Sequence, residues 1–392
     1  MRSYVLLSVA LISCAPVLAA QSAPPFQIYG GYTRLSNSFN GIAGSQNPLN
    51  GWDAGVAFPA WHNLRVKIDV SQYTGTNLGA QQKAISIMGG GQYERIYHRE
   101  GLFVEALFGN VGMNRYWGPN AVPGETASFT TLLGGGLDTP INKHFAIRVQ
   151  GDYRYENLAL IQAVTNTTPY RVPGLPKNFA SFSTGLVWIP RLGSSSFTQV
   201  HKRERSPVES DLQFEDLNSF GHIHIFANSW WSYLHVGGVE YDRHSWGKFI
   251  GARMDYVAEI LPVAIFKQPS VTDVWGNRLS STFETIYGLG ISPAGLRMLW
   301  RDGKAWKPYY LIKGGVIAFN RKAISQDAAY WNFSLQQSIG VQFRLNSRWD
   351  MRAGIEHFHF SDAFIVPSNP GIDEMSYSAA LTLHLGKRPN GK

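Results

Sequence analysis

The stretch Trp331-Asn332-Phe333-Ser334-Leu335-Gln336-Gln337-Ser338-Ile339-Gly340-Val341-Gln342-Phe343 alternates in hydrophobicity with a period of two. Its odd positions are apolar except for Gln337, and its even positions are polar or glycine. Successive side chains of a β-strand point to opposite faces, so the pattern predicts one long strand with an apolar and a polar face. Strands of soluble proteins usually run about five or six residues, whereas strands that cross a membrane as part of a barrel need about ten. This stretch therefore favours a transmembrane β-barrel.

The same alternation recurs throughout the first half of the chain, for example over 64–70 and 145–155. It predicts eight strands, near 26–38, 51–59, 62–73, 83–96, 101–114, 126–138, 143–157 and 177–190. The joints between them are alternately tight and long, as expected for short periplasmic turns and longer outer loops. An even number of strands also returns the chain to the periplasmic side. By this pattern, residues 21–190 resemble the small barrels of the outer-membrane-protein-A type.

A polar stretch with many charges, 191–219, follows and is interpreted as a solvated periplasmic linker. A second series of eight strands is predicted within 220–392, near 220–226, 231–242, 247–266, 282–300, 306–319, 331–344, 347–361 and 373–386. The fold class is thus all-β, with two tandem eight-stranded antiparallel transmembrane β-barrels. One sixteen-stranded pore is the competing architecture, which the long charged linker disfavours.

Composition and the N-terminus indicate the compartment. Residues 1–20 combine a positive Arg2, a short apolar core and small residues before Ala20, which predicts a secretory signal peptide. Lipidation at Cys14 is an open alternative, because Leu11-Ile12-Ser13-Cys14 resembles a lipobox. The net charge is +8, yet an exported chain is not expected to bind nucleic acid. We expect the protein in the outer membrane of a Gram-negative bacterium.

The last two predicted strands contain the residues most suggestive of chemistry, Glu356-His357-Phe358-His359-Phe360-Ser361-Asp362 and then Asn369-Pro370-Gly371-Ile372-Asp373-Glu374. Together with Glu259-Ile260-Leu261-Pro262, the run 287–297 and Lys307-Pro308-Tyr309, they resemble the lipid A 3-O-deacylase family of acyloxyacyl-type hydrolases. That family carries a His-x-Ser-Asn motif, an Asn-Pro-Gly-Ile-type loop and a carboxylate at the start of the next strand. The resemblance covers roughly 230–386.

The resemblance implies a serine nucleophile, a histidine base and an acid that orients the histidine, at Ser361, His359 and Asp373. The alternation of side chains along each strand supports this choice independently. Ser361, His359 and Asp373 are at odd positions, which form the apolar faces of their strands, whereas Glu374 is at an even position and would point into the barrel. The loop between the strands would lie outside the cell, so the three residues would meet the outer leaflet that holds lipopolysaccharide. Asp362 stands in place of the family's Asn, so an oxyanion site would need backbone N–H groups. Asp373 also replaces a Glu.

Two functions are consistent with these residues. One is an ester hydrolase that removes an acyl chain from lipid A without a cofactor or metal, and the other is a non-catalytic barrel for membrane integrity, adhesion or passage of small solutes. The pair His222-x-His224 has no identifiable third metal ligand, and it is interpreted as lining the lumen. The run Met88-Gly89-Gly90-Gly91 lies in a predicted strand and lacks the Lys-Ser/Thr ending of a phosphate-binding loop.

Overall fold

The computed structural model describes residues 26–36, 48–61, 63–77, 80–97, 100–117, 122–156, 159–163, 170–171, 177–189, 210–227 and 232–385. The expected signal peptide, Cys14 and most of the expected linker lie outside these ranges. Within them, no helix is long and apolar enough to cross a membrane.

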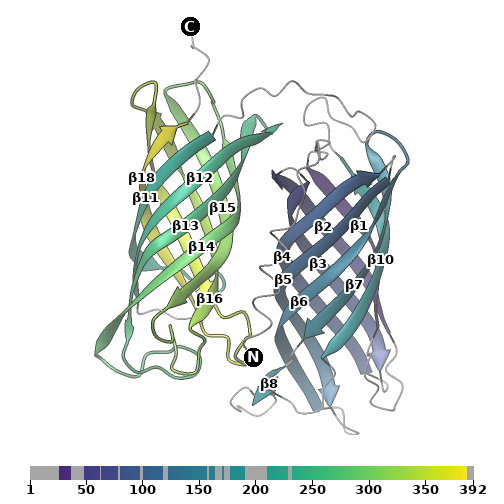
Figure 1. The fold of residues 1–392 in the computed structure, drawn as a ribbon. Coiled ribbons are helices and arrows are strands. Elements are labelled where there is room, and N and C mark those ends of the chain that lie inside the picture. Colours follow the sequence, from purple (N-terminus) through teal and green to yellow (C-terminus); the bar gives the residue numbers. More distant parts are fainter. Residues whose placement is uncertain are drawn as a thin grey trace.

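The first half of the chain folds into a closed barrel of antiparallel strands (Figure 1). Its eight barrel strands are β1 (Gln27–Ser36), β2 (Leu49–Trp61), β3 (Leu64–Asn77), β4 (Ala80–Tyr97), β5 (Glu100–Trp117), β6 (Val122–Pro140), β7 (Phe145–Glu156) and β10 (Asn178–Trp188). Two short strands, β8 (Ala159–Ala163) and β9 (Tyr170–Arg171), extend the sheet beyond β6. Pairing of β1 with β10 completes the ring. The strands expected from the alternation are all present.

The second half forms another closed barrel, in which β11 pairs with β18. Its strands are β11 (Ser210–His222), β12 (Tyr233–Phe249), β13 (Ala252–Pro269), β14 (Phe283–Leu299), β15 (Trp306–Phe319), β16 (Trp331–Arg344), β17 (Trp349–Ser361) and β18 (Gly371–His384). The two closed rings rule out the single sixteen-stranded pore. The expected boundary between the linker and the second barrel was wrong. Residues 210–219 were expected in the linker, but they belong to β11. The strand expected at 220–226 is mostly loop, because β11 ends at His222.

Both barrels have apolar outer faces and charged interiors. On β16 the odd side chains point outward, and Ile339 is 60% exposed, while the even ones are mostly buried. The largest buried side chains are mainly cationic: Arg65, Arg148, Arg154, Arg297, Arg352, Lys67 and Lys313. This distribution is the reverse of a soluble protein and is that of a barrel with lipid outside.

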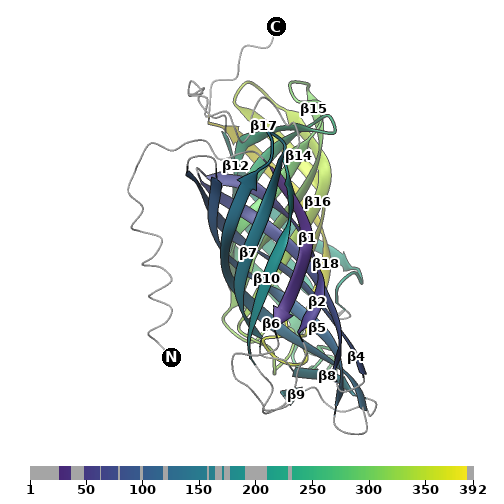
Figure 2. The same cartoon turned by 90° about the vertical axis from the view of Figure 1, so that its right-hand side faces the viewer.

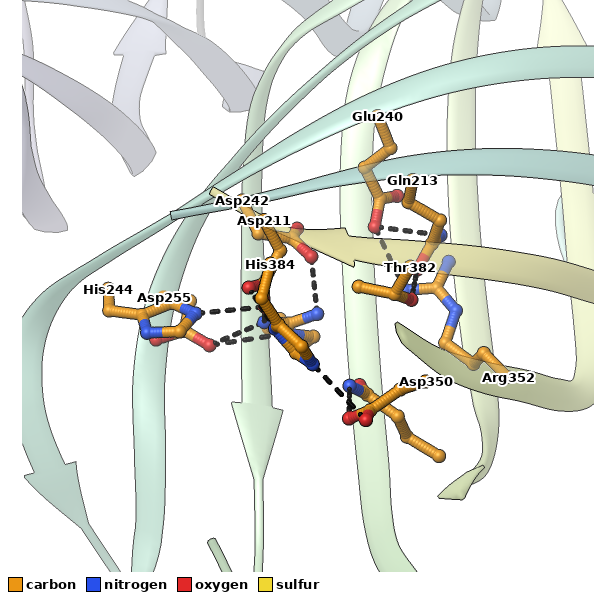
Figure 3. A network of polar contacts seen from close by, with 12 residues as sticks. Asp211, Gln213, Glu240, Asp242, His244, Asp255, Asp350, Arg352, Thr382 and His384 are labelled. Carbon is orange, nitrogen blue, oxygen red and sulfur yellow. Dashed lines mark hydrogen bonds and ion pairs between the residues drawn. The ribbon is translucent and has the colours of Figure 1, made fainter. Parts of the chain in front are cut away.

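Ion pairs fill the interior of the second barrel. Arg297 pairs with Asp211, Asp242 and Asp255, and Figure 3 shows how side chains from several strands meet in this network. His384 there bridges Asp211 at 2.6 Å and Asp350 at 3.1 Å. A buried charge is costly unless it is paired, so these contacts offset the desolvation of the charged side chains in the lumen. Side chains can fill the interior of an eight-stranded barrel.

The two barrels lie side by side with their axes in roughly the same direction (Figures 1 and 2). Near one end, Arg243 of β12 donates to the carbonyl oxygen of Ala60 on β2 at 3.1 Å. Towards the other end, the ring of Phe129 on β6 stacks on Phe333 of β16 with centroids 4.9 Å apart. Phe129 also meets Trp331 edge-on at 6.4 Å. These contacts join the barrels through their outer faces.

Candidate active site

The ends of β17 and β18 bring together the three residues singled out by sequence. His359 and Asp373 are directly opposite each other in the strand ladder, and Ser361 follows two residues later on the same face. His359 Nδ1 lies 2.7 Å from Asp373 Oδ1, and His359 Nε2 lies 3.3 Å from Ser361 Oγ. A proton on Nδ1 is thereby directed to the carboxylate, which leaves Nε2 to accept from the serine hydroxyl.

Asp373 is fully buried and accepts hydrogen bonds on both oxygens. Oδ1 also accepts from His357 Nε2 at 3.0 Å. Oδ2 accepts three backbone N–H groups, from Ile225 at 2.9 Å, Phe226 at 2.7 Å and Ala227 at 2.8 Å. So many donors stabilise the negative charge and fix the orientation of the carboxylate. Glu374 points away from this cluster and is bonded to Ser232.

Sequence reasoning missed two parts of this arrangement. The segment after β11, residues 223–227, closes over Asp373, and the Phe226 ring lies 5.3 Å from the His359 ring. His357 shares the carboxylate with His359. Its spacing in His357-x-His359-x-Ser361 puts it on the same strand face, which is a signal that the sequence did contain. No pattern in 223–227 indicates a carboxylate partner about 150 residues away.

The loop from Asp362 to Pro370 is compact and unusual in its backbone. Three residues other than glycine adopt left-handed conformations, with φ of 52° at Ala363, 65° at Phe364 and 44° at Asn369. Such conformations cost about 1–3 kcal/mol each and cluster at functional sites. Asn369 Oδ1 accepts the Phe364 N–H at 3.0 Å, which directs the amide nitrogen of Asn369 elsewhere. Asp362 is fully buried and does not line the groove between the two barrels.

A groove of about 1750 Å³ runs between the two barrels, and His359 and Ser361 lie in its wall. The second barrel contributes Phe333, Val316 and Asn369 to the lining, and the first contributes Ile87 and Phe108. The lining is mainly apolar, although it also includes Arg65, Lys67 and Asn277. His359 and Ser361 therefore face a large, mainly apolar space outside both barrels.

No metal centre emerges among the described residues. The one acidic cluster of suitable geometry there, Glu215, Glu240 and Glu259, already surrounds Lys313 Nζ at 2.8–3.0 Å. The ammonium thus occupies the position that a cation would take. β11 ends at His222, and both His222 and His224 are exposed, which contradicts the expectation that they line the lumen. Their rings are 5.7 Å apart, and His224 Nδ1 lies 3.1 Å from the Ala227 carbonyl.

Comparison with solved structures gives matches of low similarity. The outer-membrane enzyme PagL is 16% identical, with 43% of this chain and 97% of that chain covered and a TM-score of 0.31. Neisserial surface protein A (NspA) is 12% identical, with 42% and 96% covered and a TM-score of 0.31. No curated protein matches.

The comparison with family models concerns the second barrel. Closed barrels with apolar outer faces and charged lumens belong in the outer membrane of Gram-negative bacteria, and this chain is an outer-membrane protein. The resemblance noted in the sequence is confirmed there, because residues 222–382 match the lipid A 3-O-deacylase (PagL) family model.

Proposed function

We propose that the second barrel is an ester hydrolase that removes an acyl chain from lipid A. The observation that carries this proposal is the continuous relay from Ser361 Oγ through His359 to Asp373, with gaps of 3.3 and 2.7 Å. The family match over residues 222–382 supports the substrate class. A serine hydroxyl is a weak nucleophile by itself, and a histidine held by an acid is the arrangement that activates it.

The proposed reaction has two halves. Ser361 Oγ attacks the carbonyl carbon of the ester while its proton moves to His359 Nε2. The tetrahedral intermediate then breaks its bond to the sugar oxygen, which leaves as an alcohol with the proton from His359. A water molecule attacks the resulting acyl-serine with His359 again as base, and the free fatty acid departs. Asp373 stays ionised throughout and stabilises the imidazolium.

We further propose Asn369 as a donor to the oxyanion. Its Oδ1 is held by the Phe364 N–H, so its NH₂ group is what remains to donate, and Asn369 lines the same groove as Ser361. The carboxylate of Asp362, which replaces the family's Asn in sequence, is buried outside that groove. Asp362 is therefore not in a position to contact a substrate in the groove, and the role of the family's Asn is assigned to Asn369.

The site is proposed to act from the lipid-facing wall. Met351 and Ile355, on the same odd face of β17 as His359, are 42% and 41% exposed on the barrel exterior. A lipid lying against this face would bring its ester to the strand end, where Ser361 is found. Passage of solutes through this barrel fits less well, because its lumen is packed with paired charges such as Arg352 with Glu215 and Glu240.

Mass spectrometry of lipid A from outer membranes tests the proposal. Cells that produce the protein should lose one ester-linked acyl chain from lipid A, and Ser361→Ala should abolish this loss while the barrel still folds. Ser347→Ala, in an exposed turn, is the matched control and should behave as wild type. An unchanged lipid A mass in the presence of folded wild-type protein would leave the non-catalytic barrel as the better explanation.

A further inference from the structure

The groove between the barrels has two walls, and one of them belongs to the first barrel. Ile87 on β4 and Phe108 on β5 of the first barrel line it, opposite His359 and Ser361 of the second. Pockets for small molecules measure about 300–1,000 Å³, so a groove of about 1750 Å³ exceeds what one small ligand fills. Its size suits a ligand with several long chains.

The first barrel also touches the immediate neighbourhood of the nucleophile. Phe333 is the residue paired with Ser361 across the β16–β17 ladder. The same Phe333 stacks on Phe129 of the first barrel at 4.9 Å. Phe333 therefore contacts the first barrel on one side and is the ladder partner of Ser361 on the other.

Glycines make the first barrel's wall hollow. Gly89 and Gly91 on β4 share the odd, outward face with the exposed Ile85 and Ile87, and Gly112 lies on the outward face of β5. All three line the groove. A Cβ would meet only Lys67 O at 3.7 Å from Gly89 and Leu64 Cδ1 at 3.8 Å from Gly91, and nothing within 4 Å from Gly112.

The packing of the first barrel therefore does not require glycine at these three positions. Gly90, between two of them, differs: a Cβ there would lie 2.1 Å from the Ala106 carbonyl oxygen, so strand pairing itself demands glycine. Glycine at the outward positions has a different effect, which is to leave room between the barrels. A strand normally disfavours glycine, so the room is obtained at a cost in strand stability.

We propose that the first barrel forms the second wall of the substrate site, and that acyl chains of lipid A lie between the barrels against Gly89, Gly91 and Gly112. This inference rests on the proposed function. Continuity argues for this occupant, because the groove opens directly onto Ser361 and His359, so chains lying in it belong to the lipid whose ester is attacked. Holding the chains between two walls orients the ester for attack, which a single convex barrel face does less well.

Leucine substitutions in the full-length protein test this wall. Gly89→Leu should lower the rate of lipid A deacylation by at least about tenfold, while hydrolysis of p-nitrophenyl butyrate, which needs no groove, stays within about twofold. Gly112→Leu, on the adjacent strand, should show the same selective loss. Gly151→Leu is the matched control, because Gly151 also faces outward with nothing within 4 Å but does not line the groove.

The outcomes separate this inference from the proposed function. Equal lipid A rates for Gly89→Leu, Gly112→Leu and Gly151→Leu would overturn the two-walled site and leave the hydrolase intact. If wild type hydrolyses neither substrate, the proposed function fails. Lipid binding in the groove is then tested by native mass spectrometry, which identifies the lipid that co-purifies with the Ser361→Ala protein. If lipid A is bound to the Ser361→Ala protein and absent from the Ser361→Ala/Gly89→Leu double variant, the second wall of the site is supported. Bound phospholipid alone, or no bound lipid, overturns it.

Discussion

Replacing Asp373 by asparagine tests the relay most severely, because the surroundings dictate how the new amide must lie. Oδ2 of Asp373 accepts three backbone N–H groups at 2.7–2.9 Å. An NH₂ group placed there would oppose three donors, and each buried donor left unsatisfied costs about 1–3 kcal/mol. The amide oxygen of the introduced asparagine should therefore take the Oδ2 position, and its NH₂ group should face His357 and His359.

That orientation reverses the tautomer of His359. Nδ1, 2.7 Å from the former Oδ1, must now accept a hydrogen bond, so the proton moves to Nε2 and faces Ser361 Oγ. A protonated Nε2 cannot remove the serine proton. We expect a loss in kcat of about 10⁴, which corresponds to about 5.4 kcal/mol of transition-state stabilisation. Folding should survive, because the three backbone N–H groups keep their acceptor.

The assay is the initial rate of fatty-acid release from lipid A by full-length protein in detergent, with folding checked by heat-modifiable gel mobility. Glu374→Gln is the matched control, since Glu374 lies on the opposite face of β18 and bonds to Ser232. A folded Asp373→Asn protein that keeps a rate within about tenfold of wild type would contradict the proposed tautomer control, because the orienting role should account for far more. Equal losses in both variants would mean that strand parity does not select the orienting acid.

Two other substitutions probe the neighbouring groups. His357→Leu removes the Nε2–H donor to Asp373 Oδ1 and supplies no other donor in its place. A hydrogen bond to a charge is worth about 1.5–3 kcal/mol, so kcat should fall roughly 10- to 100-fold. A loss as large as that of Ser361→Ala would instead make His357 the base. Asn369→Asp keeps an acceptor for the Phe364 N–H but removes the NH₂ group. We expect kcat to fall by about 10²–10³ with KM little changed, because the oxyanion loses a donor. A fully active variant would mean that Asn369 only stabilises the loop.

The barrel class follows from local pattern, and so does part of the site. Alternation with period two determines which side chains share a face, so 331–343 alone indicates a long strand with a lipid-facing side. The same rule puts His359 and Ser361 together and prefers Asp373 to Glu374. The contacts of His359 with Ser361 and Asp373 agree with this rule, because residues two positions apart, or opposite each other on antiparallel neighbours, have their geometry fixed by the strand itself.

The start of the second barrel shows where local pattern fails. Asp211 and Glu215 made 210–219 look like part of a solvated linker, yet both are buried in the lumen. Their partners are Arg297 at 3.3 Å for Asp211 and Lys313 at 3.0 Å for Glu215, far along the chain in β14 and β15. A charge that faces solvent and a charge that faces a paired cation inside a barrel look identical in sequence.

Strand faces, and with them the outer-membrane location, could thus be predicted from the chain alone, because covalent geometry sets the periodicity of a strand. The choice of Ser361 and His359 came from the family resemblance, and strand periodicity added only that the two side chains share a face. Three features could be known only from the assembled fold: 223–227 caps Asp373 with three N–H groups, Asp362 is buried outside the groove, and the outward glycines of the first barrel line the same groove as Ser361. The cap depends on closure of the ring, and the glycine wall depends on contact between the barrels. Both features bring together residues that are distant in the chain, and the periodicity of a single strand does not determine which distant residues come into contact.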